Sequence, residues 1–294
     1  MIFAPELLPG NAGGPAAPPA RARARLRGLR PGTVVAAAFL LLLVVAVAWP
    51  GLFAADPNSA NLVAALQGPS RAHLLGTDQL GRDTFARVVY GARLSLFLGL
   101  GATVAAGAVG AAWGLAAGLG GELADEVAMR LADIFLSFPS ILTALLVVAI
   151  LGPGEVNLIV AIAASQAPVF ARVVRVQAKL VSQALYVRAA VALGLPRFAV
   201  IARHIVPNVL GPLLALLTVN LATALLTGSS LSFLGLGPQP PNPEWGSMLA
   251  QARDYLQFDP LLGVFPGVAI TVTVIAVSVV GRDLQARFEG RPRT

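Results

Sequence analysis

Long runs of uncharged, mostly apolar residues constrain this chain more than any other feature. Hydrophobic residues make up 56% of the 294 residues and charged residues only 12%, whereas about a quarter of a soluble domain is charged. Several of the runs reach the ~20 residues that a helix needs to cross a bilayer. We therefore predict an all-α polytopic membrane protein with six transmembrane helices.

The predicted spans lie between charged or proline-rich segments. They cover residues 33–53, 94–120, 133–151, 155–175, 208–236 and 261–281. The fourth span is short, because only Val156 to Ala171 separate Glu155 from Arg172; arginines that snorkel to the interface can extend it. We expect residues 33–288 to form the membrane domain, residues 1–32 a disordered basic tail, and residues 289–294 a cytoplasmic tail.

The distribution of basic residues predicts the orientation. Six spans put both termini on one side, and that side carries 16 of the 21 Lys and Arg residues. Cytoplasmic loops are the ones that carry an excess of Lys and Arg. We therefore predict a multi-pass protein of the cell's inner, cytoplasmic membrane with both termini in the cytoplasm. The net charge of +7 is explained by this topology and by contact with anionic membrane lipid. Nucleic acid is not an expected partner.

Three local patterns predict details of the spans. Gly110, Gly114 and Gly118 recur every four residues, which favours a ridge for close helix packing. Ser137 and Pro139 predict a kink near the start of the third span. Arg130 and Asp133 are spaced for an i,i+3 ion pair at a helix end.

A polar segment, Tyr186–Asn208, separates the fourth and fifth spans, and we call it the coupling segment. Ala189 and Ala190 predict a thin helix face that another protein could approach closely, Gly194 a left-handed helix end, and Pro196 the start of a second helix. The topology places this segment in the cytoplasm. Periodicity alone leaves open a helix that simply lies on the lipid surface.

The sequence lacks the motifs of catalysis and of nucleotide binding. It has no phosphate-binding G-x-x-x-x-G-K-[ST] loop, no cysteine and only two distant histidines, so we expect no catalytic residue, no metal site and no bound cofactor. The absence of a catalytic constellation counts against a membrane enzyme. A stand-alone channel or a receptor remains an alternative.

Three segments carry a resemblance to a known family. AAVALGLPRFAVIARHIVPN in the coupling segment resembles the EAA loop of ABC-importer permeases. HLLGTDQLGRDTFARVVYGARLS (73–95) and LSFLGLGPQPPNPEWGSML (231–249) resemble signatures of the dipeptide/oligopeptide/nickel permease family, in its C-type subunit. The resemblance covers about residues 33–288.

This resemblance implies the fold and the partners of an ABC importer. It implies a type I permease fold, a homologous B-type permease that helps to enclose the translocation path, two cytoplasmic ATPases that bind ATP and Mg²⁺, and an extracytoplasmic substrate-binding protein. The expected cargo is a di- or oligopeptide, with nickel or another small solute as the alternative.

The resemblance also implies which residues contact the ATPase and which form the outer motifs. The expected ATPase contacts are Tyr186, Arg188, Ala189, Ala190, Gly194, Leu195, Pro207 and Asn208. The sequence departs from the family at Arg188 and Leu185, where acids are usual, and at Arg282-Asp283 in the tail. An acid that would meet a basic patch on the ATPase is therefore missing.

The outer motifs predict turns or contacts with the binding protein. They comprise Gly76, Thr77, Asp78, Gly81, Arg82 and Asp83 in one loop and Glu244, Trp245 and Gly246 in another. The first group has turn chemistry, with Asp able to accept from backbone N–H groups, and direct contact with the ligand is the alternative. Trp245 and Tyr255 are typical of the aromatic belt at a membrane interface.

Overall fold

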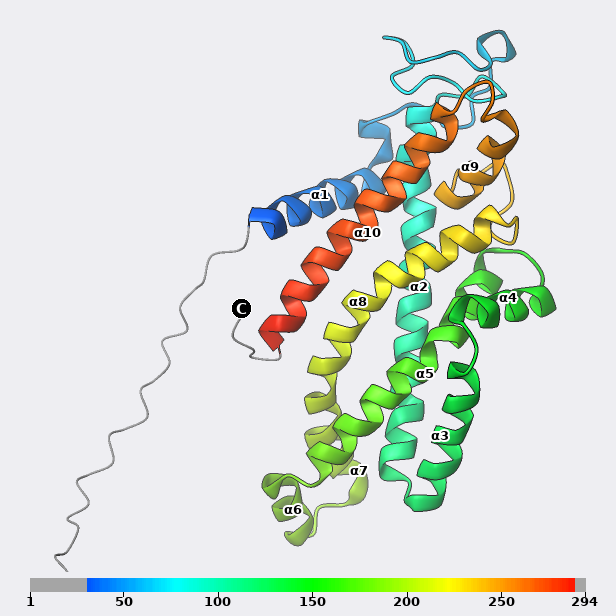
Figure 1. Ribbon diagram of the computed structural model, residues 1–294. Coiled ribbons are helices and arrows are strands. Elements are labelled where there is room, and N and C mark those ends of the chain that lie inside the picture. Colours follow the sequence, from blue (N-terminus) through cyan, green and yellow to red (C-terminus); the bar gives the residue numbers. More distant parts are fainter. Residues whose placement is uncertain (1–30, 289–294) are drawn as a thin grey trace, which may run out of the picture. The chain divides into compact units, whose positions relative to one another are not determined.

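The computed structural model describes residues 31–288, and its regular structure there is helical, with no β-strand (Figure 1). Nearly the whole of the predicted 1–32 tail and the 289–294 tail lie outside the described residues. The longer helices are α1 Pro31–Ala48, α2 Thr84–Leu119, α3 Glu122–Leu136, α4 Ser140–Leu151, α5 Glu155–Ser182, α8 Val206–Phe233 and α10 Leu261–Phe288. The shorter ones are α6 Leu185–Ala192, α7 Arg197–Val200 and α9 Trp245–Ala252, with a π-helical turn at Ile201–Ile205 and 3₁₀ turns at Pro50–Leu52, Leu62–Ala64 and Arg253–Tyr255.

Five helical stretches of the described chain are long and apolar enough to cross a membrane, and a broken helix pair is a sixth candidate. The five are α1, α2, α5, the continuous run Arg197–Phe233 that includes α8, and α10; the broken pair is α3 with α4. The all-α, multi-span class predicted from the sequence is therefore the class observed. Helix α2 begins at Thr84, ten residues before the predicted span, because the Asp83 carboxylate caps it by accepting from the Ala86 N–H at 2.8 Å.

The third predicted span differs most from the structure. Instead of one kinked helix, α3 and α4 meet at 92° across a break of three residues. Pro139 has no N–H to continue the helix, and the Ile134 carbonyl in the last turn of α3 accepts from the Ser137 hydroxyl at 2.7 Å and from the Ser137 N–H at 3.3 Å. Helix α4 then packs on α5, where Ala144 and Val148 are buried in the same cluster as residues of α5. The 92° bend therefore combines a local break with tertiary packing.

The predicted ion pair between Arg130 and Asp133 is wrong. Arg130 pairs instead with Glu126, one helical turn earlier, at 2.9 Å. Asp133 pairs with Arg172 of α5. An i,i+4 pair and a tertiary partner have replaced the i,i+3 pair that spacing alone suggested.

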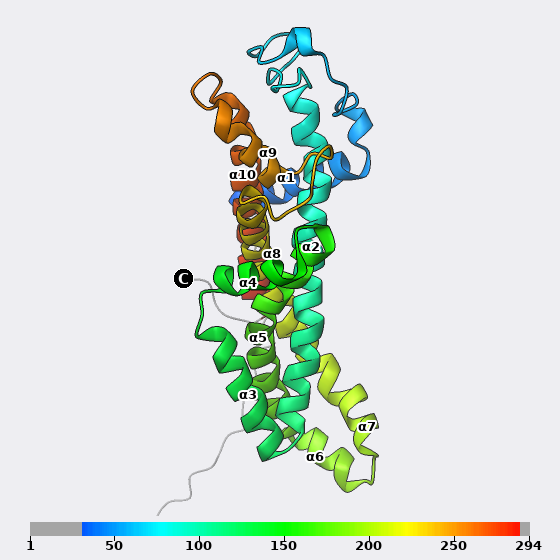
Figure 2. The same cartoon turned by 90° about the vertical axis from the view of Figure 1, so that its right-hand side faces the viewer.

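Glycines allow α2 and α5 to pack closely, as the sequence predicts (Figure 2). A Cβ at Gly110 would lie 2.6 Å from the Ala167 carbonyl oxygen, and one at Gly114 only 2.4 Å from that of Ala171. A Cβ at Gly118 would lie 3.0 Å from the Arg175 carbonyl oxygen. The glycine ridge thus meets the backbone of α5 at successive turns, and it fixes the direction in which α5 leads into α6.

The two groups of predicted site residues lie at opposite ends of α2. Helices α6 and α7 are near its C-terminal end, whereas α9 and the loop that precedes α2 are near its N-terminal end (Figures 1 and 2). We refer to these as the coupling end and the outer end. Helices α2, α5 and α8 connect them.

Candidate functional site

The coupling segment is a helix–turn–helix whose turn is set by one glycine. Gly194 has φ of +84°, a conformation that L side chains rarely adopt. The Gly194 N–H donates to the Val191 carbonyl and the Leu195 N–H to the Ala190 carbonyl, which is the Schellman arrangement for ending a helix. The left-handed end predicted for α6 is confirmed, and Pro196 precedes α7 as expected.

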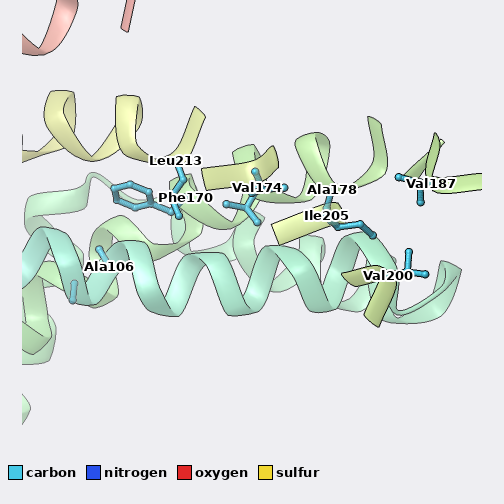
Figure 3. Packing of buried hydrophobic residues seen from close by; sticks show 10 residues of the cluster. Ala106, Phe170, Val174, Ala178, Val187, Val200, Ile205 and Leu213 are labelled. Carbon is cyan, nitrogen blue, oxygen red and sulfur yellow. The ribbon is translucent and has the colours of Figure 1, made fainter. Parts of the chain in front are cut away.

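The inner face of the coupling segment belongs to the hydrophobic core of the membrane helices. Figure 3 shows Val187, Val200 and Ile205 next to side chains of α5 such as Val174 and Ala178. These three residues of the segment are at most 5% exposed. Because buried side chains pack without voids, a displacement of α6 or α7 must also move α5 and α8.

The outer face of the coupling segment has large exposed side chains with no cover from the described chain. Leu193 is 82% exposed, Phe198 81% and Tyr186 48%, and Arg188 and Ala189 are also exposed. Ala190, in contrast, is buried at 8%. The prediction that both alanines form one thin outer face is therefore wrong for Ala190, which faces the protein's own core because it lies one residue further around the helix.

Polar contacts hold the middle and the C-terminal end of the segment. The Arg197 guanidinium donates to the Leu119 carbonyl at the end of α2, and Asn208 donates from its side chain to the His204 carbonyl at 2.6 Å. The rings of Tyr186 and His204 lie 6.2 Å apart, at 58° to each other. Leu195 is partly buried, while Pro207 is exposed in the first turn of α8.

An ionic cluster beside the coupling segment was missed in the sequence. The Asp125 carboxylate of α3 accepts from both Arg175 and Lys179 of α5, just before α6. The i,i+4 spacing of these two basic residues places them on one face of α5, which was the available signal. The cluster ties α3 to the part of α5 that leads into the coupling segment.

At the outer end, Asp78 is the centre of a buried turn. One carboxylate oxygen accepts from the Leu80 N–H at 2.9 Å and the Arg82 N–H at 3.0 Å. The other oxygen pairs with Arg82 at 2.7 Å and with Arg87 at 3.4 Å. All three charged side chains are at most 8% exposed, so these contacts stabilise a turn and leave no oxygen facing solvent.

The neighbouring motif residues also have structural partners. Gly76 and Gly81 have φ of +73° and +69°, and a Cβ at Gly81 would lie 1.8 Å from the Asn61 carbonyl oxygen. Thr77 is fully buried; its hydroxyl donates to the Ala64 carbonyl and accepts from the Gln67 N–H. Asp83, besides capping α2, lies 2.8 Å from His73 Nδ1. The geometry is that of the predicted turn.

The second outer motif attaches α9 to α2 and α8. Glu244 is 1% exposed and caps α9 by accepting from the N–H groups of Gly246 and Ser247, while the Ser95 hydroxyl donates to it at 3.1 Å. Burial raises the pKa of the Glu244 carboxyl, and these hydrogen bonds oppose that rise. A Cβ at Gly246 would lie 2.5 Å from the Ser229 carbonyl oxygen of α8.

Trp245 does not belong to an exposed interface belt, and that prediction is wrong. It is only 3% exposed, and its indole N–H donates to the Val88 carbonyl of α2 at 2.8 Å. Tyr255 is partly exposed. The hydropathy of a loop does not distinguish an aromatic side chain at the lipid surface from one inserted between helices.

Comparisons with known proteins agree with this arrangement. The family of binding-protein-dependent transport system inner membrane components matches residues 108–294. The dipeptide transport system permease protein DppC of Alkalihalophilus pseudofirmus is 41% identical over 90% of this chain and 86% of its own length. The glutathione transport system permease protein GsiD of Pectobacterium atrosepticum is 38% identical over 88% of this chain and 87% of its own.

The chain belongs to this family. It is a multi-pass membrane permease subunit of an ABC importer, a class that works with a partner permease, an ATPase and a binding protein. A third relative, the probable D,D-dipeptide transport system permease protein DdpC of Escherichia coli, is 39% identical over 86% of this chain and 87% of its own. Among the described residues of this permease, no group of three or more His, Cys, Asp or Glu side chains could hold a metal ion.

The electrostatics of the permease's coupling segment follow from its composition. No Asp or Glu occurs between Glu155 and Glu244, and the exposed Arg188 and Arg203 form no ion pair within the described part of the chain. The outer face of the segment therefore combines exposed apolar side chains with unpaired positive charge. Apolar and acidic groups are the complement of such a surface.

Proposed function

We propose that this chain is the C-type permease subunit of an importer for di- and oligopeptides. The support is that the three relatives are named for a dipeptide, for glutathione and for a D,D-dipeptide, all of which are small peptides. The subunit encloses the translocation path with a homologous B-type permease, and an extracytoplasmic binding protein delivers the peptide.

In this proposal the chain itself is not an enzyme. It has no phosphate-binding loop, so ATP and Mg²⁺ bind to two partner ATPase subunits in the cytoplasm. The concentration of Lys and Arg on one side of the membrane supports a cytoplasmic location for both termini and for the coupling segment.

The observation that carries the proposed mechanism is the division of the coupling segment into two faces. Its inner face is buried with α5, whereas its outer face is exposed. An ATPase bound to the outer face would move α5 and α8 as a rigid unit when nucleotide closes it, which switches access of the path from outside to inside. The outer contacts are Tyr186, Arg188, Ala189, Gly194, Pro207 and Asn208; Ala190 and Leu195 support the segment from within.

A bulky side chain on the outer face tests this mechanism. We expect Ala189→Trp to abolish ATPase association and peptide uptake while the permease pair still assembles. Ala60→Trp, the same substitution at an exposed alanine of the outer loop, is the control. Co-purification of the ATPases and uptake of radiolabelled dipeptide measure the two effects, and unchanged association in Ala189→Trp would overturn the proposal.

The transported solute is tested separately. Proteoliposomes that contain both permeases and both ATPases, with the binding protein added outside, should import dialanine or trialanine only in the presence of ATP. Uptake of nickel instead of peptide would reassign the cargo. Solute flux through this chain alone, without ATPases, would indicate a channel.

A further inference from the structure

A cavity of about 540 Å³ lies at the outer end, where α2, the start of α5 and the loops before α2 and α9 meet. Charged and aromatic side chains line it, including Asp56, Arg93 and Glu155 together with Tyr90 and Phe97. This volume is within the range of roughly 300–1,000 Å³ that is usual for small-molecule sites. The lining includes parts of the 73–95 and 231–249 segments but none of the turn and cap residues described above.

The charges in this cavity do not neutralise one another. Among the described residues, neither Arg93 nor Glu155 forms an ion pair, and the Asp56 carboxylate accepts only from the N–H of its neighbour Asn58. Asp56 and Arg93 are exposed and Glu155 is half-buried, whereas the buried Asp78 and Arg82 pair with each other. Opposite charges that line one cavity without pairing leave room for a ligand that carries both signs.

We propose that this cavity binds the charged ends of a peptide, an inference that rests on the proposed function and deepens it. The Arg93 guanidinium receives the C-terminal carboxylate through charge-assisted hydrogen bonds. Asp56 and Glu155 receive the N-terminal ammonium, and the rings of Tyr90 and Phe97 contact the peptide's side chains. A cation alone, nickel included, would leave Arg93 unpaired and would be repelled by it.

The position of the cavity agrees with an entry site. Exposed residues continue from it along one face of α2, at Phe97, Leu100 and Val104, which are 55%, 48% and 61% exposed. Spacings of three and four residues keep these side chains on one face. The face runs from the cavity toward the coupling end, so a peptide held in the cavity is at the start of an uncovered helix surface.

Photocrosslinking during turnover tests where the peptide binds. The assembled transporter, with Phe97 replaced by benzoyl-phenylalanine, is illuminated with radiolabelled trialanine, ATP and binding protein. We expect the permease to become labelled by the peptide and excess unlabelled trialanine to prevent it. The same replacement at Phe258, an exposed outer residue outside the cavity, should give no peptide label. Crosslinking of residue 97 to the binding protein or to the partner permease alone would overturn the proposal.

Charge-neutral variants test the roles of the individual side chains. We expect Arg93→Gln and Glu155→Gln each to raise the KM for trialanine uptake roughly tenfold, with unchanged assembly, basal ATP hydrolysis and binding-protein affinity, and Arg93→Lys to recover most of the loss. Arg253→Gln, at an exposed outer arginine, is the matched control.

Different results would overturn the peptide-importer function and the peptide-binding cavity. If the wild-type transporter imports no peptide, the proposed function fails. If it imports peptide while both Gln variants keep the wild-type KM, or weaken only the affinity for the binding protein, the cavity proposal alone is wrong.

Discussion

The coupling end and the outer end of this permease both contain long sequence motifs, yet they use them in opposite ways. Asp78, Glu244 and Trp245 at the outer end are buried, and their polar atoms have partners inside the chain. At the coupling end, Leu193 and Phe198 are more than 80% exposed. The comparison shows that the outer motifs mainly stabilise their own subunit, whereas the coupling segment leaves large apolar side chains uncovered.

The largest expected effect is at the outer turn. Asp78→Ala would leave Arg82 and Arg87 buried without their counter-charge, and removing one partner of a buried ion pair costs roughly 3–5 kcal/mol. We expect little folded transporter, measured as the fraction that stays monodisperse in detergent after heating.

The exposed pair of Arg253 and Asp254 provides the control for this variant. Both side chains are at least 67% exposed, so Asp254→Ala should change the stability by less than about 1 kcal/mol. Equal heat stability of the two alanine variants would contradict a structural role for the Asp78 turn.

The next effect is expected at the crossing of α2 and α5, which connects the two ends. A methyl group at Gly114 would lie 2.4 Å from the Ala171 carbonyl oxygen, so Gly114→Ala should force the helices apart and lower the stability by about 1–3 kcal/mol. Gly211 lies in α8 with open space around it, so Gly211→Ala should be neutral or slightly stabilising. Thermal denaturation of both variants measures the difference, and a fully stable Gly114→Ala protein would refute the close crossing.

A smaller effect on stability is expected at the turn of the coupling segment. Nothing lies within 4 Å of a Cβ at Gly194, but its φ is +84°, so Gly194→Ala costs only the backbone strain of about 1–2 kcal/mol. We expect a folded permease with weaker ATPase association and slower uptake. Gly194→Asn should retain more association, because asparagine adopts this conformation more readily than alanine; the reverse order would indicate that the turn is not what the ATPase requires.

The smallest effect on stability, and the sharpest on association, is expected at Arg188. The side chain is exposed and forms no ion pair within the described residues, so Arg188→Glu should leave the heat stability within about 0.5 kcal/mol of wild type. An acidic ATPase surface would repel the new glutamate, so the dissociation rate of the ATPase should rise. The rise should be larger at low salt, because salt screens the repulsion. Tighter ATPase binding in Arg188→Glu would mean that the partner's surface is basic, as in the usual family pairing.

Several features followed from the sequence because they depend on neighbours along the chain. Apolar runs separated by charges predicted the membrane helices, glycines four residues apart predicted a face for close helix packing, and the Gly194-Leu195-Pro196 order predicted a helix end. The carboxylates of Asp78 and Asp83 could be assigned to turns, as acceptors from nearby backbone N–H groups, for the same reason.

Tertiary structure alone decided how these elements face one another. Pro139 predicted an interruption, but the 92° between α3 and α4 depends on the packing of α4 against α5. Ala190 is buried while Ala189 is exposed, and Trp245 packs beside α2. Asp133 pairs with Arg172, which is 39 positions away in the sequence.

The difference between the features predicted from the sequence and those decided by the tertiary structure has one physical reason. Hydrogen-bonded turns and apolar runs are local, so residue order determines them. Burial and the pairing or isolation of a charge depend on segments far apart in the sequence, as the separate charges of Asp56, Arg93 and Glu155 around one cavity illustrate.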